Sequence, residues 1–125
     1  MELIILGCGS SLGSPWISNY WVNCDKKNKL NRRTRCSAFI KKGNLSILID
    51  SSPDIKEQFI KNKINDLDCV LYTHEHSDQT SGIFELRPFF WKNKKKFLYT
   101  EVNEQQNYSN RNTHSAFLLD LDINQ

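Results

Sequence analysis

The chain has 125 residues, 38% of them apolar, and its 17 Lys and Arg against 14 Asp and Glu give a net charge of +3. This length suits one domain with a hydrophobic core of its own. No apolar run approaches the roughly 20 residues of a membrane-crossing helix, and residues 1–6 lack the basic flank of a signal peptide. We therefore expect a cytoplasmic protein without a membrane partner.

The first predicted element is a strand over residues 2–6, buried on both sides, which ends at a glycine-rich loop. The glycines of this loop, at positions 7, 9 and 13, do not have the G-x-G-x-x-G spacing of a dinucleotide site. Residues 16–35 show neither a helical nor an alternating period, so they are predicted to be irregular. A β-hairpin should follow over residues 36–50, because Gly43 and Asn44 form a two-residue turn pair between apolar runs.

A helix is predicted over residues 53–63, where serine can cap, proline can occupy the first turn, and Asp54 favours the positive end. Ile55, Phe59 and Ile60, extended by Ile64, have the spacing of one buried stripe.

The remaining elements are a strand over residues 68–72, a helix within 80–91 and a strand near 96–100. From residue 101 the chain is mostly polar. We therefore predict a folded unit over residues 1–100 and a poorly packed tail over 101–125.

Basic residues are concentrated in residues 26–42, which contain no acid. The cations are Lys26, Lys27, Lys29, Arg32, Arg33, Arg35, Lys41 and Lys42. Two interpretations stay open: a solvated loop in a chain rich in Lys, Asn and Ile, or a surface for an anionic partner.

The cysteines are also informative, because none lies in a C-x-x-C pair that would suggest a zinc ribbon or a redox dithiol. We expect Cys8, Cys24, Cys36 and Cys69 to be reduced and mostly buried as small hydrophobic side chains.

The chemistry is concentrated directly after the strand predicted over residues 68–72, where His74, His76 and Asp78 alternate along the chain. Side chains at i and i+2 of an extended or turning segment project to the same side, so two imidazoles can bind one metal ion. The carboxylate of Asp78 can hold that ion or a second one. Imidazole and carboxylate ligands suit Zn, Mn or Fe(II), with Zn the first expectation.

At these residues the sequence resembles the metallo-β-lactamase fold superfamily, whose hallmark is H-x-H-x-D-H after a strand. Four neighbouring stretches strengthen the resemblance: L-G-C-G-S-S-L-G-S-P at 6–15, R-T-R-C-S-A at 33–38, L-I-D-S-S-P at 48–53 and G-I-F-E-L-R-P-F at 82–89. Together they are similar to the branch that contains cyclic phosphodiesterases. The resemblance covers about residues 2–100.

This resemblance implies an α+β chain that forms the N-terminal half of a four-layer αββα sandwich. It further implies two metal ions, one held by His74 and His76 and the other by Asp78 and residue 79, with a bridging hydroxide as the nucleophile. Arg33 and Arg35 would bind the substrate phosphate, although structural or solvent-facing roles are the alternative. The family's final histidine is replaced by Gln79, which should weaken the second metal site.

The family normally draws further ligands from its second half, and His114 is the only other histidine of this chain. We therefore expect a truncated or split protein whose missing half is supplied by a partner chain or by self-association. The resulting hypothesis is a metal-dependent hydrolase, a phosphodiesterase for a small cyclic or nucleotide-like ester, with weak or absent turnover as this chain alone. The alternatives are a noncatalytic nucleic-acid-binding module, which uses the basic run with Trp16, Tyr20 and Trp21, and an inactive fragment.

Overall fold

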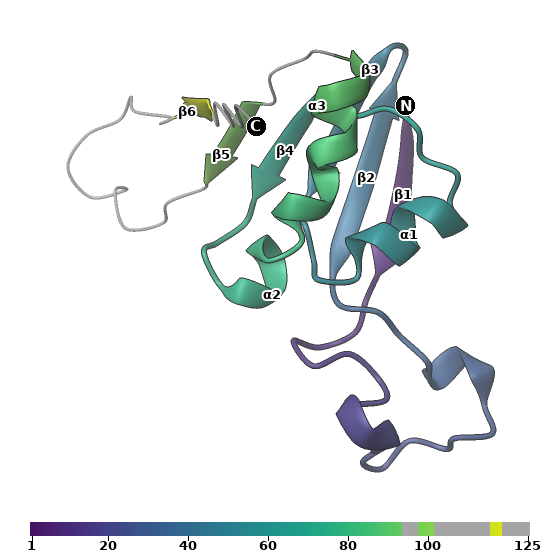
Figure 1. Ribbon diagram of the computed structural model, residues 1–125. Helices are drawn as coiled ribbons and strands as arrows, with labels where there is room; N and C mark the ends of the chain where they lie inside the picture. Colours follow the sequence, from purple (N-terminus) through teal and green to yellow (C-terminus); the bar gives the residue numbers. More distant parts are fainter. Residues whose placement is uncertain (94–97, 102–115, 119–125) are drawn as a thin grey trace, which may run out of the picture.

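The computed structural model describes residues 1–93, 98–101 and 116–118. Its strands form one mixed sheet in chain order (Figure 1). They are β1 (Glu2–Gly7), β2 (Ser37–Lys42), β3 (Leu45–Ile49), β4 (Cys69–Tyr72), β5 (Leu98–Glu101) and β6 (Ala116–Leu118). The pairs β3–β4 and β4–β5 are parallel, and the others are antiparallel.

The helical elements are short. The α-helices are α1 (Ile55–Lys61), α2 (Ser77–Thr80) and α3 (Arg87–Asn93), and the 3₁₀ turns are η1 (Ile17–Asn19), η2 (Lys29–Asn31) and η3 (Ile83–Leu86). None of the helices in the described ranges is long and apolar enough to cross a membrane.

The predicted hairpin is confirmed as β2 and β3, with Lys42 opposite Leu45. Gly43 has a φ of 59°, a left-handed conformation that glycine adopts without the strain of a side chain. The predicted tail lies outside the described residues except for residue 101 and β6, which pairs with β5.

Helix α1 begins at Ile55, two residues later than predicted, and ends two residues earlier. Asp54 occupies the N-cap position but its side chain makes no capping hydrogen bond. Its carboxylate is instead bound by Arg35, as described below. The predicted stripe is correct for Ile55 and Phe59 and wrong for Ile60, which is 70% exposed.

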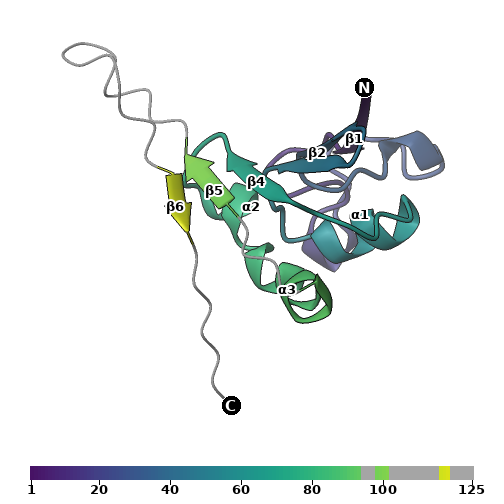
Figure 2. The same cartoon turned by 90° about the horizontal axis from the view of Figure 1, so that it is seen from above.

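The core lies between one face of the sheet and the layer formed by α1, η3 and α3 (Figures 1 and 2). Leu48 and Val70 are neighbours on β3 and β4 and are fully buried. The ring of Phe59 makes edge contacts with Phe39 and Phe89, at centroid distances of 6.0 and 5.7 Å. Helix α1 is therefore the element that joins the sheet to α3.

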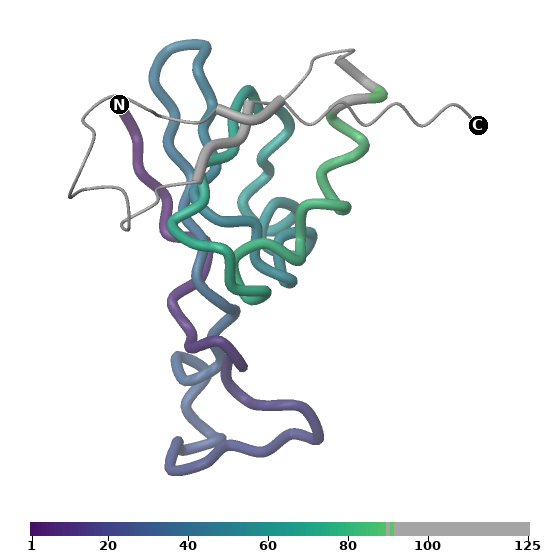
Figure 3. Tube along the Cα trace, turned by 90° about the vertical axis from the view of Figure 1, so that its left-hand side faces the viewer, coloured from purple at the N-terminus to yellow at the C-terminus, as the bar shows by residue number. Residues whose placement is uncertain are grey.

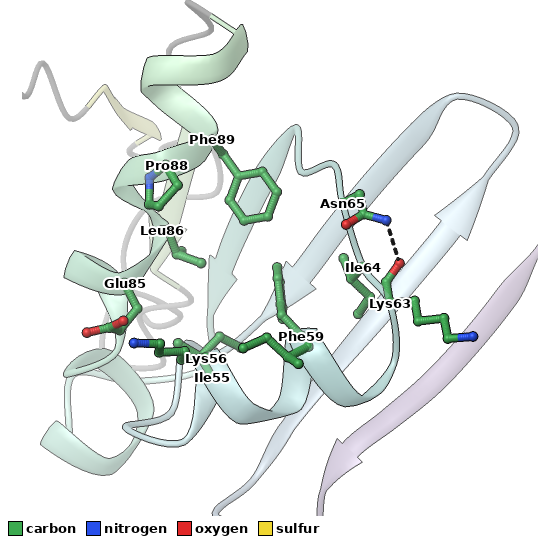
Figure 4. A pocket seen from close by; sticks show the side chains of 11 residues that line it. Ile55, Lys56, Phe59, Lys63, Ile64, Asn65, Glu85, Leu86, Pro88 and Phe89 are labelled. Carbon is green, nitrogen blue, oxygen red and sulfur yellow. Dashed lines mark hydrogen bonds between the residues drawn. The ribbon is translucent and has the colours of Figure 1, made fainter.

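An apolar groove of about 480 Å³ remains between α1 and the η3–α3 segment (Figure 4). Phe59, Leu86 and Phe89 line it, with Lys56 and Glu85 also on its wall. The groove belongs to the helical layer of the domain.

The opposite face of the sheet is apolar, and its described side chains are exposed or half-buried. Leu3 and Ile5 on β1 are 59% and 61% exposed, so the prediction of a strand buried on both sides is wrong for the described structure. The register continues this face across neighbouring strands through Ala38, Ile40, Ile47, Ile49, Cys69 and Leu71. Alternation along each strand thus separates a covered face from an open one.

Residues 8–36 form an excursion between β1 and β2, which we call the arm (Figures 1 and 3). It extends beyond the end of the sheet and contains the two 3₁₀ turns η1 and η2 and three isolated β-bridges. The prediction of an irregular segment over residues 16–35 is confirmed apart from these turns. Cys8, Cys24 and Cys36 are exposed, which corrects the expectation of mostly buried thiols.

Candidate functional site

The site forms where three strands end at the same edge of the sheet. Strands β1 and β3 are both antiparallel to β2, and β4 is parallel to β3, so their carboxyl ends coincide. The arm, the loop that leads into α1 and the loop that leads into α2 all leave from this edge (Figure 1). The carboxyl ends of parallel strands are a common location for ligand sites, because loops from several strands converge there.

The loop after β4 brings three potential metal ligands together. One ligand atom of each of His74, His76 and Asp78 lies within 4.8 Å of the others. The imidazole centroids of the two histidines are 4.6 Å apart with an interplanar angle of 76°. Zinc binds nitrogen and oxygen at about 2.0–2.2 Å in a tetrahedral arrangement, so two donors to one ion lie roughly 3.3–3.6 Å apart. A modest side-chain adjustment therefore suffices for a common cation.

A hydrogen-bond chain fixes the orientation of His74. Thr73 donates its backbone N–H to Asp50 Oδ1 at 2.8 Å and its hydroxyl hydrogen to Asp50 Oδ2 at 2.8 Å. A carboxylate only accepts, so the single hydroxyl hydrogen of Thr73 is used. The contact of 3.0 Å between Thr73 Oγ1 and His74 Nδ1 then requires the imidazole to donate from Nδ1. In neutral His74 this leaves the Nε2 lone pair available to a metal.

Asp50 itself is held by the end of the hairpin. Its side chain is buried, its N–H donates to Leu71 O at 2.9 Å, and its carbonyl accepts from Ser37 Oγ at 2.7 Å. Its φ of 59° is in the left-handed region, which Asp tolerates better than most residues. Sequence reasoning gave neither Asp50 nor Thr73 a role, although both flank predicted strand ends.

Gln79 carries the clearest unsatisfied group of the site. Its side chain is 8% exposed and its Nε2 donates to Asp78 Oδ2 at 3.0 Å. Its Oε1 is buried without a hydrogen-bond partner in the described structure. A buried oxygen left unpaired costs about 1–3 kcal/mol, so a water or cation beside it would be stabilising. The donor set and this oxygen fit a divalent cation held by His74, His76 and Asp78, with Gln79 as a weaker neutral ligand.

The two predicted phosphate-binding arginines have different surroundings. Arg35 binds Asp54 with Nε to Oδ2 at 2.8 Å and Nη2 to Oδ1 at 2.5 Å, and its backbone N–H donates to Oδ2 at 2.9 Å. The hydrogen bonds lower the pKa of Asp54, and the same carboxylate raises the pKa of Arg35, to which Asp78 adds a smaller electrostatic contribution. The Nη1 hydrogens of Arg35 make none of these bonds, so its role toward phosphate stays a prediction.

Arg33 is exposed, and its Nη1 contacts Cys8 Sγ at 3.0 Å. It forms no ion pair with a carboxylate of the described ranges. Arg33 and Arg35 both line a cavity of about 870 Å³ between the arm and the start of α1.

A family model described as the beta-lactamase superfamily domain matches residues 46–123. The chain belongs to the metallo-β-lactamase superfamily. The match begins in β3 and includes the loop of His74, His76 and Asp78. It also continues past residue 100, so it extends beyond the resemblance predicted over about residues 2–100.

Three proteins of known name are similar to this chain. A curated octanoyltransferase of Porphyromonas gingivalis (strain ATCC BAA-308 / W83) is 38% identical over 104 residues, which are 82% of this chain and 21% of that protein. The crystal structure of a new diphosphatase from the PhnP family aligns with a TM-score of 0.62 and 34% identity, over 70% of this chain and 34% of that one.

The Zn²⁺-bound PqqB from Methylobacterium extorquens aligns with a TM-score of 0.55 and 24% identity, over 70% of this chain and 36% of that one. This likeness supports the fold alone. The chain thus spans about a fifth to a third of the length of the relatives it matches. Its sheet and short helices are those of the N-terminal part of the superfamily's α+β fold.

Proposed function

We propose that this chain provides a divalent-metal site for the hydrolysis of phosphodiester or diphosphate bonds. The observation that carries the proposal is the convergence of one ligand atom each from His74, His76 and Asp78, beside the buried unpaired oxygen of Gln79. Membership of the superfamily supports hydrolytic chemistry, and the 34% identity to a diphosphatase favours phosphate substrates.

The likeness to the octanoyltransferase does not favour acyl transfer, because the matched segment is 21% of that protein. When bound, a divalent cation lowers the pKa of water and neutralises the charge that develops on a phosphate. Zn²⁺ fits the donor set best, and Mn²⁺ or Fe²⁺ are the alternatives.

The chain's own residues have distinct tasks in this proposal. Asp50 and Thr73 engage Nδ1 of His74, which leaves its Nε2 free to bind a metal. Arg33, exposed and without a carboxylate partner in the described part of the chain, attracts the anionic ester. The chain spans 34% of the length of the diphosphatase it matches, so we expect turnover by this chain alone to be slow.

The test is hydrolysis of bis(p-nitrophenyl) phosphate by the chain with added Zn²⁺ or Mn²⁺. We expect slow turnover that requires the metal and is lost in the His74→Ala/His76→Ala variant. Glu75→Gln is the matched control, since Glu75 lies between the two histidines and is not part of the cluster. Hydrolysis that persists unchanged in the double variant would refute the assignment, as would metal-loaded protein that neither cleaves nor binds the ester.

A further inference from the structure

None of the metal-cluster residues His74, His76 and Asp78 lines the cavity between the arm and α1. Its volume of about 870 Å³ lies in the range of pockets that hold small organic ligands. Its walls come from residues within 12–20 and 32–35 of the arm, and from Asp54 and Glu57 at the start of α1. The side chains of these walls indicate which class of ligand the cavity binds.

One wall is aromatic. Trp16 and Tyr20 are joined by a backbone hydrogen bond from Trp16 N to Tyr20 O at 2.9 Å, and their ring centroids are 5.4 Å apart at 60°. Ser18 and Asn19, between them, have φ values of 66° and 60°. Two consecutive left-handed residues define a tight turn that presents both rings together. The two side chains are 38% and 56% exposed, so flat apolar surface faces solvent.

The other wall is cationic. Arg32, Arg33 and Arg35 line the cavity with the two acids Asp54 and Glu57, and within the described part of the chain only Arg35 forms an ion pair, with Asp54. Arg32 lies over the ring of Trp21 at 5.4 Å from the centroid, which keeps its charge beside an aromatic surface. Lys26, Lys27 and Lys29 add positive charge to the same arm against the single acid Asp25. The field therefore favours an anion.

Aromatic faces beside arginines match one ligand chemistry, a nucleobase with an adjacent phosphate. Bases of any sequence stack on exposed tryptophan and tyrosine rings, and guanidinium groups bind phosphate through paired N–H donors. A purely apolar ligand would leave Arg33 without an anionic partner, and a bare phosphate would make no use of the rings.

We infer that this cavity binds a nucleoside phosphate unit, with the base on Trp16 and Tyr20 and the phosphate toward Arg33. The unit can be a free nucleotide or part of a single strand, since both present the same chemistry. The inference shares Arg33 with the proposed function and goes beyond it by assigning the base to the arm, and none of the residues lining the cavity belongs to the metal cluster.

The inference is tested by isothermal titration of the full-length His74→Ala/His76→Ala variant in EDTA, so that metal chemistry is absent. We expect AMP to bind about tenfold or more tightly than adenosine, which lacks the phosphate, and than ribose 5-phosphate, which lacks the base. This comparison needs no change in the arm. AMP binding no tighter than ribose 5-phosphate, or absent at millimolar concentrations, would overturn the inference.

Variants locate the site. Tyr20→Ala and Arg33→Gln should each weaken AMP binding at least tenfold while the far-UV circular dichroism of the protein is unchanged. Trp91→Leu and Arg87→Gln are matched controls, because Arg87 lies over Trp91 at 5.9 Å in a similar pair on α3, outside the cavity. Equal losses in the controls and in the arm variants would contradict the assignment.

A ten-residue oligoadenylate distinguishes the two sources of the ligand. Binding at least tenfold tighter than AMP at the same salt concentration indicates a strand, and equal affinity per site indicates a free nucleotide. Both results keep the cavity as a nucleoside phosphate site. A chain that binds AMP here but takes up no metal would refute the proposed function alone.

Discussion

Thr73 is the residue through which the sheet controls the proposed metal site. Its hydroxyl connects the buried carboxylate of Asp50 to Nδ1 of His74. Replacement of a residue that orients a metal-binding histidine typically reduces metal affinity about 10- to 100-fold. We predict a loss of this size in Thr73→Val, which keeps the shape of the side chain but removes the hydroxyl. Zinc affinity measured by competition with a chelating dye checks the prediction.

Thr73→Ser provides the matched control, because it retains the hydroxyl. Its zinc affinity should stay within a few-fold of that of the wild-type protein. If Thr73→Val binds zinc as tightly as Thr73→Ser, the hydrogen-bond chain does not position His74.

The ion pair between Asp54 and Arg35 should make the free energy of unfolding depend on pH in the acidic range. Hydrogen bonds from Arg35 lower the pKa of Asp54 in the folded chain. A carboxyl group with a lowered folded-state pKa contributes stability above its unfolded-state pKa, and this contribution is lost as pH falls through the folded-state value. Asp54→Asn should therefore be less stable than the wild type at pH 7, by about 1 kcal/mol for a partly exposed pair.

The difference between the two proteins should shrink between pH 5 and pH 2, as shown by urea unfolding at several pH values. Glu57→Gln removes the same charge from an exposed position on α1 and is the control. A stability difference for Asp54→Asn that is constant over this pH range would contradict the account.

At the scale of single residues, the sequence identified the potential ligands but not their supports. His74, His76 and Asp78 are close along the chain, so their spacing alone predicts that they converge. Asp50 and Thr73 are 23 positions apart, and Arg35 and Asp54 are 19 apart. Contacts between residues so far apart depend on the strand register and on the path of the arm. Neither of these can be predicted from a short stretch of sequence.

Among the elements, α1 connects the sheet to α3, since Phe59 contacts rings on β2 and α3. Phe59→Ala removes a buried ring and should reduce the free energy of unfolding by about 3–5 kcal/mol. Ile60→Ala, on the exposed side of the same helix, should cost less than about 1 kcal/mol. Chemical denaturation of both variants checks the prediction, and equal costs would contradict the packing described.

In the segment before η3, the backbone of Gly82 lies close to the backbone of Ser51 and Ser52. A Cβ on Gly82 would lie 2.1 Å from Ser52 O, and Gly82 N donates to Ser51 O at 2.8 Å. Gly82→Ala should therefore destabilise the chain by about 1–3 kcal/mol, because backbone must move. Gly43→Ala is a useful comparison, since space is open there and only the left-handed φ opposes the substitution. A smaller cost at Gly82 than at Gly43 would contradict this interpretation.

Elements with strong local signals were predicted well. The turn pair Gly43–Asn44 located the hairpin, and the apolar run before His74 located β4. The predicted start of α1 is two residues too early, because the side chain of Asp54 binds Arg35 and makes no capping hydrogen bond. The exposure of Ile60 was missed because the helical period does not show how wide the covering layer is.

For the whole molecule, the open apolar face of the sheet has a consequence in solution. Leu3 and Ile5 are more than half exposed on β1, and large exposed apolar patches promote association. We expect the 14.6 kDa chain to self-associate as its concentration rises, and Leu3→Gln/Ile5→Gln to shift it toward the monomer. Ile17→Gln/Leu30→Gln, at exposed positions on the arm, is the control. Sedimentation equilibrium checks this, and a wild-type chain that stays monomeric would contradict it.

The central claim is that His74, His76 and Asp78 hold one divalent cation where β4 ends. Calorimetric titration of the metal-free chain with Zn²⁺ tests it most directly. The account predicts one tightly bound ion per chain in the wild type and in Glu75→Gln, and at least 100-fold weaker binding in His74→Ala/His76→Ala. Equal zinc affinity in the wild type and the double variant would contradict it.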